Sequence, residues 1–446
     1  MLNKALSLVI TCLFLTTQMA TALTLPATTT PVLPIEHWVL SNGANVYFVP
    51  EHQLPMVDME VLFNAGSAQD ADHFGVANFT NSMIGEGAQD LSADEIANIF
   101  DSLGALFDTN CARDTAQLSL RTLTDPPILE KASNTFAHIL TQPSFGTANF
   151  SRVKNQLLQA ILEEEQTPSV LADNAFYSAI YGTHPYAHDP LGNTATVKRL
   201  TPNDLMTFYR SHYVGMNATV AIVGDLSSKQ ALKLSKKIVG DLPAGTLPAP
   251  LPALEPLSQQ TPIHIDYPST QTFIRIGQLG IQRNDPAYFS LYVGNYILGG
   301  GQLVSQLFKT VRDQHGLTYN INSYFIPMQE QGPFITALQT RNNNTREAIT
   351  LTKEVIQHFI AQGPSTDELT AAKKNITGGF PLLFSSNANI VDLVALIGFY
   401  HLPLTYLDDY RDRINAVTSE DVKTAFNQQL NVDKMAIVTV GEATHV

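Results

Sequence analysis

The sequence predicts an α+β protein of two homologous domains, each with an antiparallel-rich sheet covered by helices. Three observations support this: a repeat that relates the two halves, a Pro-rich segment between them, and strand pairs mixed irregularly with amphipathic helices. A parallel doubly wound sheet would instead require regular alternation of strands and helices. The length of 446 residues fits two domains, since one domain usually holds about 100–200 residues.

The repeat is clearest where each half ends. Residues 200–209 read LTPNDLMTFY and residues 417–426 read VTSEDVKTAF, with an offset of 217 residues. In both copies a threonine stands three residues before an aspartate, which resembles a capping box at a helix start. An apolar β-branched run follows at 218–223 and at 435–440, so each half is expected to end with a helix and a strand.

Composition marks the domain boundary. Residues 242–257 read LPAGTLPAPLPALEPL and contain five prolines, a composition that favours an extended, semi-rigid linker. We therefore expect a linker at 242–260 between an N-terminal domain at 30–241 and a C-terminal domain at 261–446.

Local patterns predict the elements of each half. In the first half they indicate a hairpin at 36–49, a strand at 56–64, a capped helix after Ser92 and a long amphipathic helix at 151–166. In the second half they indicate a strand at 272–280, a flexible glycine turn at 299–301, a helix at 302–315 that Gly316 ends, and a strand at 317–325.

The first 22 residues have the pattern of a secretory signal peptide. Lys4 precedes an apolar run, and Ala20-Thr21-Ala22 supplies small residues for cleavage. The run is too short for a comfortable transmembrane helix, and we expect no membrane span after cleavage. Cleavage would remove Cys12 and leave Cys111 without an internal disulfide partner. We expect a secreted protein, in a periplasm if the source is bacterial.

Charge and cysteine content exclude several classes of protein. The 26 Lys and Arg residues against 40 Asp and Glu residues give a net charge of −14. A nucleic-acid binder or a protein that docks on anionic membrane needs a basic face instead. Two cysteines are too few for a disulfide scaffold or a cysteine zinc ribbon.

Common catalytic motifs are missing from the sequence. It contains no GxSxG elbow, Walker loop or GxGxxG. His184 and His188 have the residue type of metal ligands, but the neighbouring prolines place them on a loop. A displaced metal site built from these histidines and Glu163 remains one alternative, and ordinary structural roles for them remain the other.

Two segments together resemble the pitrilysin/insulinase peptidase family. After a strand that ends at residues 64–67, Gly75-Val76-Ala77 leads into a helix at the place of the family's inverted zinc motif, H-x-x-E-H. Residues 298–325, LGGGQLVSQLFKTVRDQHGLTYNINSYF, are similar to the family's glycine loop and R…GLxY motif. The resemblance covers nearly the whole mature chain and implies that its two domains form half of a clamshell.

The zinc motif itself is degenerate. Asn78, Asn81 and Ser82 stand where the family has its first histidine, its general-base glutamate and its second histidine. The family's third ligand, a glutamate, falls at Gln159 or Ala160, with Glu163 one turn further on. Catalytic zinc requires three histidine or carboxylate ligands. We therefore expect no cofactor in this chain, no peptidase activity of the chain alone, and zinc in a partner chain.

The second motif is retained as Arg312 and Tyr319. The resemblance implies that this pair holds the substrate backbone, while a homologous partner chain supplies the zinc motif. The side chains suit this role, since a guanidinium and a phenol both donate hydrogen bonds to peptide carbonyls. Arg312 is expected one turn beyond Phe308, and Tyr319 on one strand face with Leu317 and Ile321.

The sequence thus leads to two main hypotheses. The preferred one is a non-catalytic, substrate-positioning subunit of a secreted heterodimeric zinc endopeptidase that acts on unfolded peptides. Its partners would be a homologous zinc-motif chain and a peptide substrate. The alternative is a catalytically inactive peptide-binding or assembly protein that keeps the peptidase fold.

Overall fold

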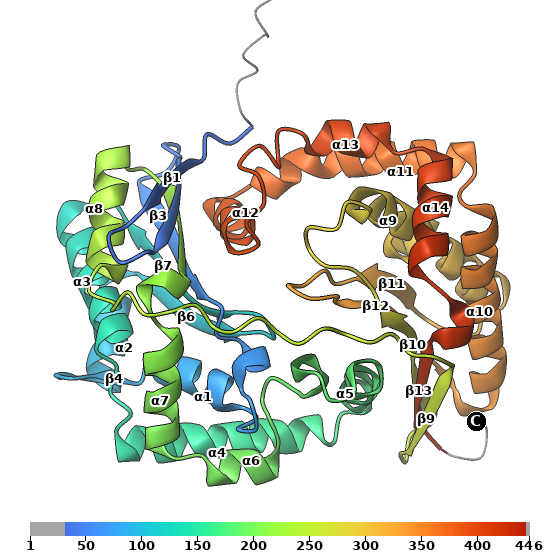
Figure 1. Cartoon of the computed structure of the whole chain (residues 1–446), viewed down its shortest axis with the longest axis horizontal. Helices are drawn as coiled ribbons and strands as arrows, with labels where there is room; N and C mark the ends of the chain where they lie inside the picture. Colours follow the sequence, from blue (N-terminus) through green and yellow to red (C-terminus); the bar gives the residue numbers. More distant parts are fainter. Residues whose placement is uncertain (1–31, 443–446) are drawn as a thin grey trace, which may run out of the picture.

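The computed structural model describes residues 32–442, which form two domains facing each other across the centre of the molecule (Figure 1). The predicted signal peptide at 1–22, with Cys12, lies outside the described residues. Each domain has one main sheet, with most of its helices on the outer side (Figure 1).

The first sheet has six strands in the order β1-β2-β8-β3-β7-β6. All neighbours are antiparallel except β2 and β8, so the antiparallel-rich sheet predicted from sequence is confirmed. The strands are β1 (Glu36–Val39), β2 (Asn45–Pro50), β3 (Met56–Phe63), β6 (Leu106–Cys111), β7 (Ala116–Leu123) and β8 (Ala218–Gly224).

The second sheet repeats this arrangement with five strands in the order β11-β12-β10-β13-β9. Its only parallel pair is β13 with β9, so in both domains the last strand lies between one parallel and one antiparallel neighbour. The strands are β9 (Thr261–Asp266), β10 (Gln271–Leu279), β11 (Ile321–Phe325), β12 (Pro333–Arg341) and β13 (Ala436–Gly441).

The predicted capping boxes are observed. Thr201 and Thr418 form capping boxes with Asp204 and Asp421 at the starts of α7 (Pro202–His212) and α14 (Ser419–Gln429). A third capping box, between Ser92 and Glu95, opens α2 (Ala93–Leu103). The long amphipathic helix is α4 (Thr147–Glu164), which buries Phe150, Val153, Leu157 and Ile161.

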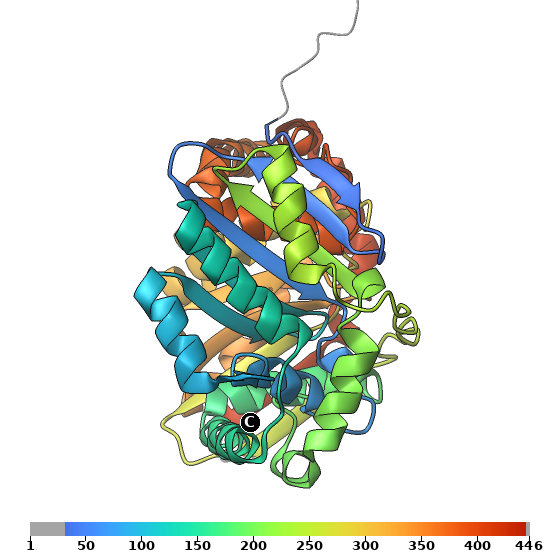
Figure 2. The same cartoon turned by 90° about the vertical axis from the view of Figure 1, so that its left-hand side faces the viewer.

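Helices cover the outer face of each sheet. Figure 2 shows α2 (cyan), α3 (teal) and α8 (yellow-green) across the first sheet. The remaining helices that frame the domains are α1 (Val76–Met83), α3 (Pro126–Thr141), α6 (Thr194–Arg199), α8 (Ser228–Val239), α9 (Tyr288–Asn295), α10 (Thr345–Gln362), α11 (Thr366–Gly379) and α13 (Tyr410–Ala416).

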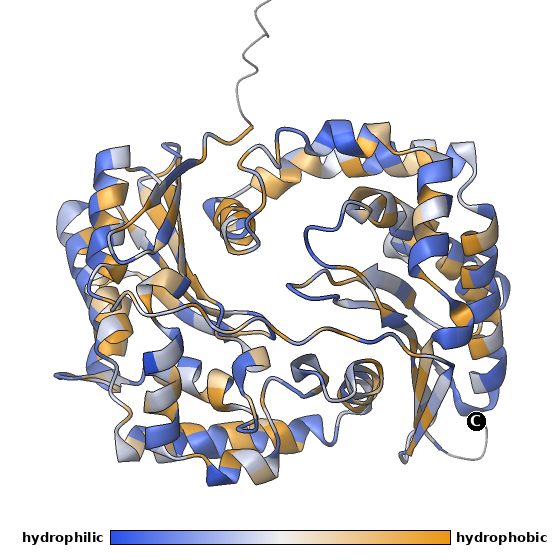
Figure 3. Cartoon of the chain, in the orientation of Figure 1, coloured by the Kyte–Doolittle hydropathy of each residue, from blue (hydrophilic) through white to orange (hydrophobic). Residues whose placement is uncertain are grey.

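Part of each inner face is covered by a helix that comes from the other half of the chain. Helix α5 (Pro168–Tyr181) belongs to the first half but packs on β10 and β13, while α12 (Asn387–Phe399) of the second half packs on β3 and β8. Val391 and Val394 of α12 are 3% and 0% exposed against the first sheet. Helix α12 is apolar around most of its circumference (orange in Figure 3), as expected for a helix buried on several sides.

The segment after the glycines differs from the prediction. Instead of one helix at 302–315 there is a 3-10 turn at Gln302–Val304 and, after Ser305, a π-helix at Phe308–Gln314. The Ser305 hydroxyl donates to the Gln302 carbonyl, so it closes the short turn and does not continue a helix. Gly316 has φ +63° and ends the helix as predicted.

Two further predictions in this region are wrong. The glycine segment is helical: a π-helix spans Tyr296–Gly300, and a Cβ on Gly299 would lie 2.3 Å from Ser323 Oγ, so only glycine packs there. The strand predicted at 317–325 begins at Ile321. The Thr318 side chain bonds to the Gln339 carbonyl at 2.7 Å, so a side chain attaches this segment to β12 before the strand ladder begins.

Residues 242–260 contain neither helix nor strand. Leu251, Leu254 and Leu257 from this segment pack against the core under α5. Among the described residues no single helix is long and apolar enough to cross a membrane, although one bent pair, 366–384 with 387–399, has the length and composition.

Candidate functional site

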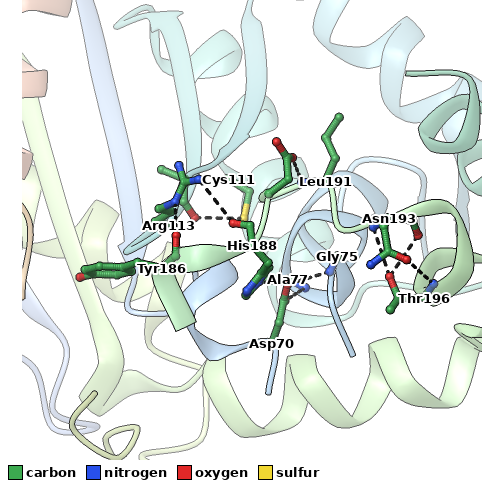
Figure 4. Close-up of polar contacts among 12 residues, drawn as sticks. Asp70, Gly75, Ala77, Cys111, Arg113, Tyr186, His188, Leu191, Asn193 and Thr196 are labelled. Carbon is green, nitrogen blue, oxygen red and sulfur yellow. Dashed lines mark hydrogen bonds and ion pairs between the residues drawn. The ribbon is translucent and has the colours of Figure 1, made fainter. Parts of the chain in front are cut away.

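Helix α1 carries the degenerate motif, and its start is held by a buried carboxylate. Asp70 accepts hydrogen bonds from the backbone N–H groups of Gly75 and Ala77 at 2.7 and 2.8 Å, and lies 3.0 Å from His188 Nε2 (Figure 4). Gly75 has φ +92°, a conformation that favours glycine. Burial raises the pKa of Asp70 against the opposing effect of His188. The pair therefore fixes the entry into α1.

Asn81, at the position of the general-base glutamate, is a structural residue. It is 1% exposed, and its Nδ2 donates to the carbonyl oxygens of Asn110 at 2.9 Å and Gln117 at 3.2 Å. Its Oδ1 accepts the Tyr213 hydroxyl at 3.0 Å. These bonds tie α1 to β6 and β7 and use both amide hydrogens as well as the oxygen. Asn81 is therefore not placed to activate water.

Asn78 and Ser82 occupy the other two motif positions. Both are half-buried, and within residues 32–442 their side chains make no hydrogen bond. A neutral amide and a hydroxyl are poor substitutes for two imidazoles. With Asn81 engaged, the three residues do not fit a catalytic zinc ion.

Of the three candidate positions for the third zinc ligand on α4, only Glu163 is a carboxylate, and its side chain is exposed. Gln159 and Glu163 are exposed and Ala160 is half-buried; all three border a shallow surface hollow. Glu164, the next residue, is half-buried, and burial together with Asp189 raises its pKa to about 7. None of these side chains contacts the three motif positions through a hydrogen bond in the described chain.

The histidines of the alternative metal site have separate partners. His184 is buried; its Nδ1 accepts the Tyr186 N–H at 3.1 Å, and its Nε2 donates to the Pro252 carbonyl at 3.0 Å. Both ring nitrogens are thus engaged, and burial lowers the pKa of His184. His188 pairs with Asp70 and stacks on Phe74. Over residues 32–442, no three His, Cys, Asp or Glu side chains gather as a metal site would require.

The structure brings Arg312 and Tyr319 together. The guanidinium carbon of Arg312 lies 5.9 Å from the centre of the Tyr319 ring and 4.7 Å from that of Phe308. Arg312 Nη1 also lies 2.7 Å from Asp313 Oδ1. Tyr319 is 81% exposed and precedes β11, so it does not share a strand face with the buried Leu317 and Ile321. That expectation was wrong because the ladder begins only at Ile321.

A cavity beside the glycine π-helix was not predicted from the sequence. It has a volume of about 440 Å³ and includes Arg283, Tyr292 and Asn295 in its lining. Asn295 Nδ2 donates to the Ser323 carbonyl at 2.9 Å, which fixes the π-helix against β11. The glycine run in the sequence could have indicated close packing beside this cavity. Arg283 belongs to no recognisable motif, so its place in the lining could not be predicted.

Family profiles match both halves of the chain. The profile described as insulinase, peptidase family M16, matches residues 47–194, and the profile described as peptidase M16 inactive domain matches residues 199–376. Together they reach from the first sheet into the helices of the second domain.

Relatives carry two kinds of names. The sequence is 23% identical to the non-peptidase homolog YmxG of Helicobacter pylori, over 89% of this chain and 91% of that protein. It is 25% identical to the zinc protease PqqE of the same species, over 45% of this chain and 46% of that protein.

Solved structures share the fold. A peptidase M16 inactive domain from Pseudomonas fluorescens is 38% identical with a TM-score of 0.89, over 92% of this chain and 99% of that one. A Helicobacter pylori protease is 19% identical with a TM-score of 0.83 over the same shares, and this likeness shows the fold alone.

Proposed function

The chain belongs to peptidase family M16 as an inactive homologue, and from this membership we propose that it is the non-catalytic, substrate-positioning subunit of a secreted heterodimeric zinc endopeptidase. In this role it binds an unfolded peptide while a homologous partner chain holds zinc and performs the hydrolysis.

One observation supports the proposal: Arg312 and Tyr319, the two residues of the R…GLxY motif, lie side by side, whereas the zinc-motif positions hold no histidine or carboxylate. The guanidinium of Arg312 lies close to the rings of both Phe308 and Tyr319, and Tyr319 is 81% exposed. A side chain with that exposure contributes little to the core, so its place beside Arg312 is better explained by a ligand than by packing. An unfolded peptide offers unpaired backbone carbonyls to both donors.

The zinc site must then come from another chain. Asn81 has no free hydrogen-bonding group, and neither Asn78 nor Ser82 offers an imidazole or a carboxylate. The occurrence of a relative named non-peptidase homolog and one named zinc protease in a single species supports a two-chain arrangement.

Assembly tests the proposal directly. The mature chain is mixed with the zinc-motif homologue from the same cell, and the mass of the product is measured by light scattering after size exclusion. We expect a one-to-one complex. A mixture in which each chain elutes alone at micromolar concentration contradicts the heterodimer.

The alternative function predicts a different product. An inactive peptide-binding or assembly protein would form a stable homodimer or remain alone, and would bind peptide without the homologue. The secreted location is tested separately by N-terminal sequencing of the exported protein. We expect the mature chain to begin just after Ala22.

A further inference from the structure

The inner face of the first sheet is only partly covered by α12. Its apolar part, with Tyr47, Leu62 and Val223, packs against that helix. The part formed by β3, β7 and β6 borders a cavity of about 340 Å³, whose walls carry both charged and apolar side chains. The cavity lies between the first sheet and a helix of the second domain, so it belongs to the interior shared by the two halves.

Four carboxyl groups and a single cation line this cavity: Asp58, Glu60, Asp108, Asp392 and Arg121. Asp58 and Glu60 are each 5% exposed, whereas Asp108 and Asp392 are exposed, so the acidic surface reaches from a buried base to an open edge. Every charged residue on the elements that form the cavity is included in this set.

The one cation does not satisfy the acidic groups. Arg121 Nε donates to Asp58 Oδ1 at 2.7 Å, but Asp58 Oδ2 is buried and has no hydrogen-bond partner in the described chain. Glu60 meets the amide of Gln117 and, instead of a cation, the carboxyl group of Asp392 on α12. A buried carboxylate oxygen without a donor is costly, and native structures rarely leave one unless a ligand or water completes it.

The contact between two carboxyl groups favours the protonated form of Glu60. Burial, and then the neighbouring Asp392, raise the pKa of Glu60 well above its ordinary value of 4.5. Glu60 therefore keeps its proton at neutral pH when no cation is bound beside it. A cation entering the cavity would take the place of that proton.

We propose that this cavity binds the guanidinium group of an arginine side chain in the bound peptide, so that the chain selects peptides with arginine. This inference rests on the proposed function and adds to it a substrate class. A guanidinium is planar and carries five N–H donors, so it can reach acceptors that stand apart. A metal ion is a poorer occupant, because no three acidic, histidine or cysteine groups of the described chain converge on one point.

The walls also suit the rest of an arginine side chain. Met59, Leu106 and Val391 line the same cavity as the carboxyl groups. Such apolar surface packs against the aliphatic stem while the charged end reaches the carboxylates. The exposed Asp108 and Asp392 provide the first attraction for a positive side chain.

Direct binding by the full mature chain tests the inference. The probes are a short, fluorescently labelled unfolded peptide with one central arginine and the same peptide with citrulline, which has the same shape without the charge. Fluorescence anisotropy should show about tenfold tighter binding of the arginine peptide, the size expected for one charge-assisted contact. Equal affinity for the two peptides would overturn the inference.

Variants locate the site. Asp392→Asn should remove the preference for arginine, and the matched control Glu420→Gln, at an exposed position on α14, should keep it. Glu60→Gln is a second variant that preserves the shape of the protonated side chain and therefore the fold. A preference unchanged in both cavity variants would contradict the site.

Release of a proton on peptide binding distinguishes a binding role of Glu60 from a purely structural one. Calorimetry of the arginine peptide at pH 7.5 in two buffers of different ionisation enthalpy should show proton release by the wild-type chain and much less by Glu60→Gln. Absence of release from the wild type would contradict displacement of the Glu60 proton. These assays use the chain alone, whereas the assembly test uses the mixture of two chains. Arginine selection and partner assembly can therefore be confirmed or contradicted independently of each other.

Discussion

The hydroxyl of Tyr400, at the end of α12, donates a 3.0 Å hydrogen bond to Asp114 Oδ2 in the turn between β6 and β7. The same oxygen accepts the Gln329 N–H at 2.8 Å, and Oδ1 accepts the hydroxyl of Tyr186. Asp114 is 4% exposed. A single carboxylate of the first domain thus collects donors from both domains, and with the exchanged helices α5 and α12 it holds the two halves together.

Replacing Asp114 should loosen that junction. Asp114→Ala leaves two hydroxyls and one N–H without an acceptor, and we expect a loss of about 3–5 kcal/mol in the free energy of unfolding, measured by urea denaturation. Tyr400→Phe removes one bond and should cost about 1 kcal/mol. The surface control Asp101→Ala should be close to wild type; an Asp114→Ala variant equal to that control would refute the role of the junction.

Asn81 should be required for folding and not for chemistry. In Asn81→Asp a carboxylate would face the carbonyl oxygens of Asn110 and Gln117, so we expect a loss of about 3 kcal/mol at pH 7 and a smaller loss at pH 4, where the acid is protonated. Ser82→Ala, which removes no hydrogen bond in the described chain, should stay within about 0.5 kcal/mol. Thermal unfolding at the two pH values decides this, and equal losses at both would contradict it.

Glu60 should make stability fall as pH rises. Its pKa is raised in the folded state, so its favourable contribution is complete below the ordinary value of 4.5 and is lost as pH rises from there toward the folded-state pKa. We expect Glu60→Gln to unfold at the same temperature as wild type near pH 4 and at a higher temperature near pH 8. A variant less stable than wild type at pH 8 would contradict this prediction.

Arg312 and Tyr319 should matter for turnover and not for stability. With the partner chain present, Arg312→Ala should lower kcat/KM for an unfolded peptide by about 100-fold, the effect of removing a donor to the developing oxyanion. Tyr319→Phe should lower it as well, with an unchanged unfolding temperature because the ring is 81% exposed. The control Tyr292→Phe keeps full turnover. Normal turnover in both Arg312 and Tyr319 variants would exclude the positioning role.

The parts of the fold that local chemistry determines were predictable from the sequence. Capping boxes at Ser92, Thr201 and Thr418 and the left-handed Gly316 follow from short-range hydrogen bonding and backbone sterics. The repeat offset of 217 residues likewise predicted two similar sheets. These features depend on neighbours within a few residues, or on one copy resembling the other.

Features that depend on distant segments were not predictable. Helices α5 and α12 each pack on the sheet of the other half. The hydrophobic periodicity of a helix shows which of its faces is buried, but not which sheet buries it. Leu317, Tyr319 and Ile321 stand at alternate positions, as in a strand. The Thr318 hydroxyl, however, bonds to the carbonyls of Asn320 and Gln339 where backbone hydrogen bonds between strands were expected. The acidic cavity joins Glu60 to Asp392 across more than half of the chain, with no local pattern at either residue.

The most direct test of the central claim is hydrolysis of an internally quenched unfolded peptide by the mature chain alone, by its zinc-motif homologue alone, and by the mixture. The account predicts no hydrolysis by this chain and activity of the mixture well above that of the homologue. Hydrolysis by this chain alone that a chelator abolishes would contradict the account, because Asn78, Asn81 and Ser82 would then not have ended its zinc chemistry.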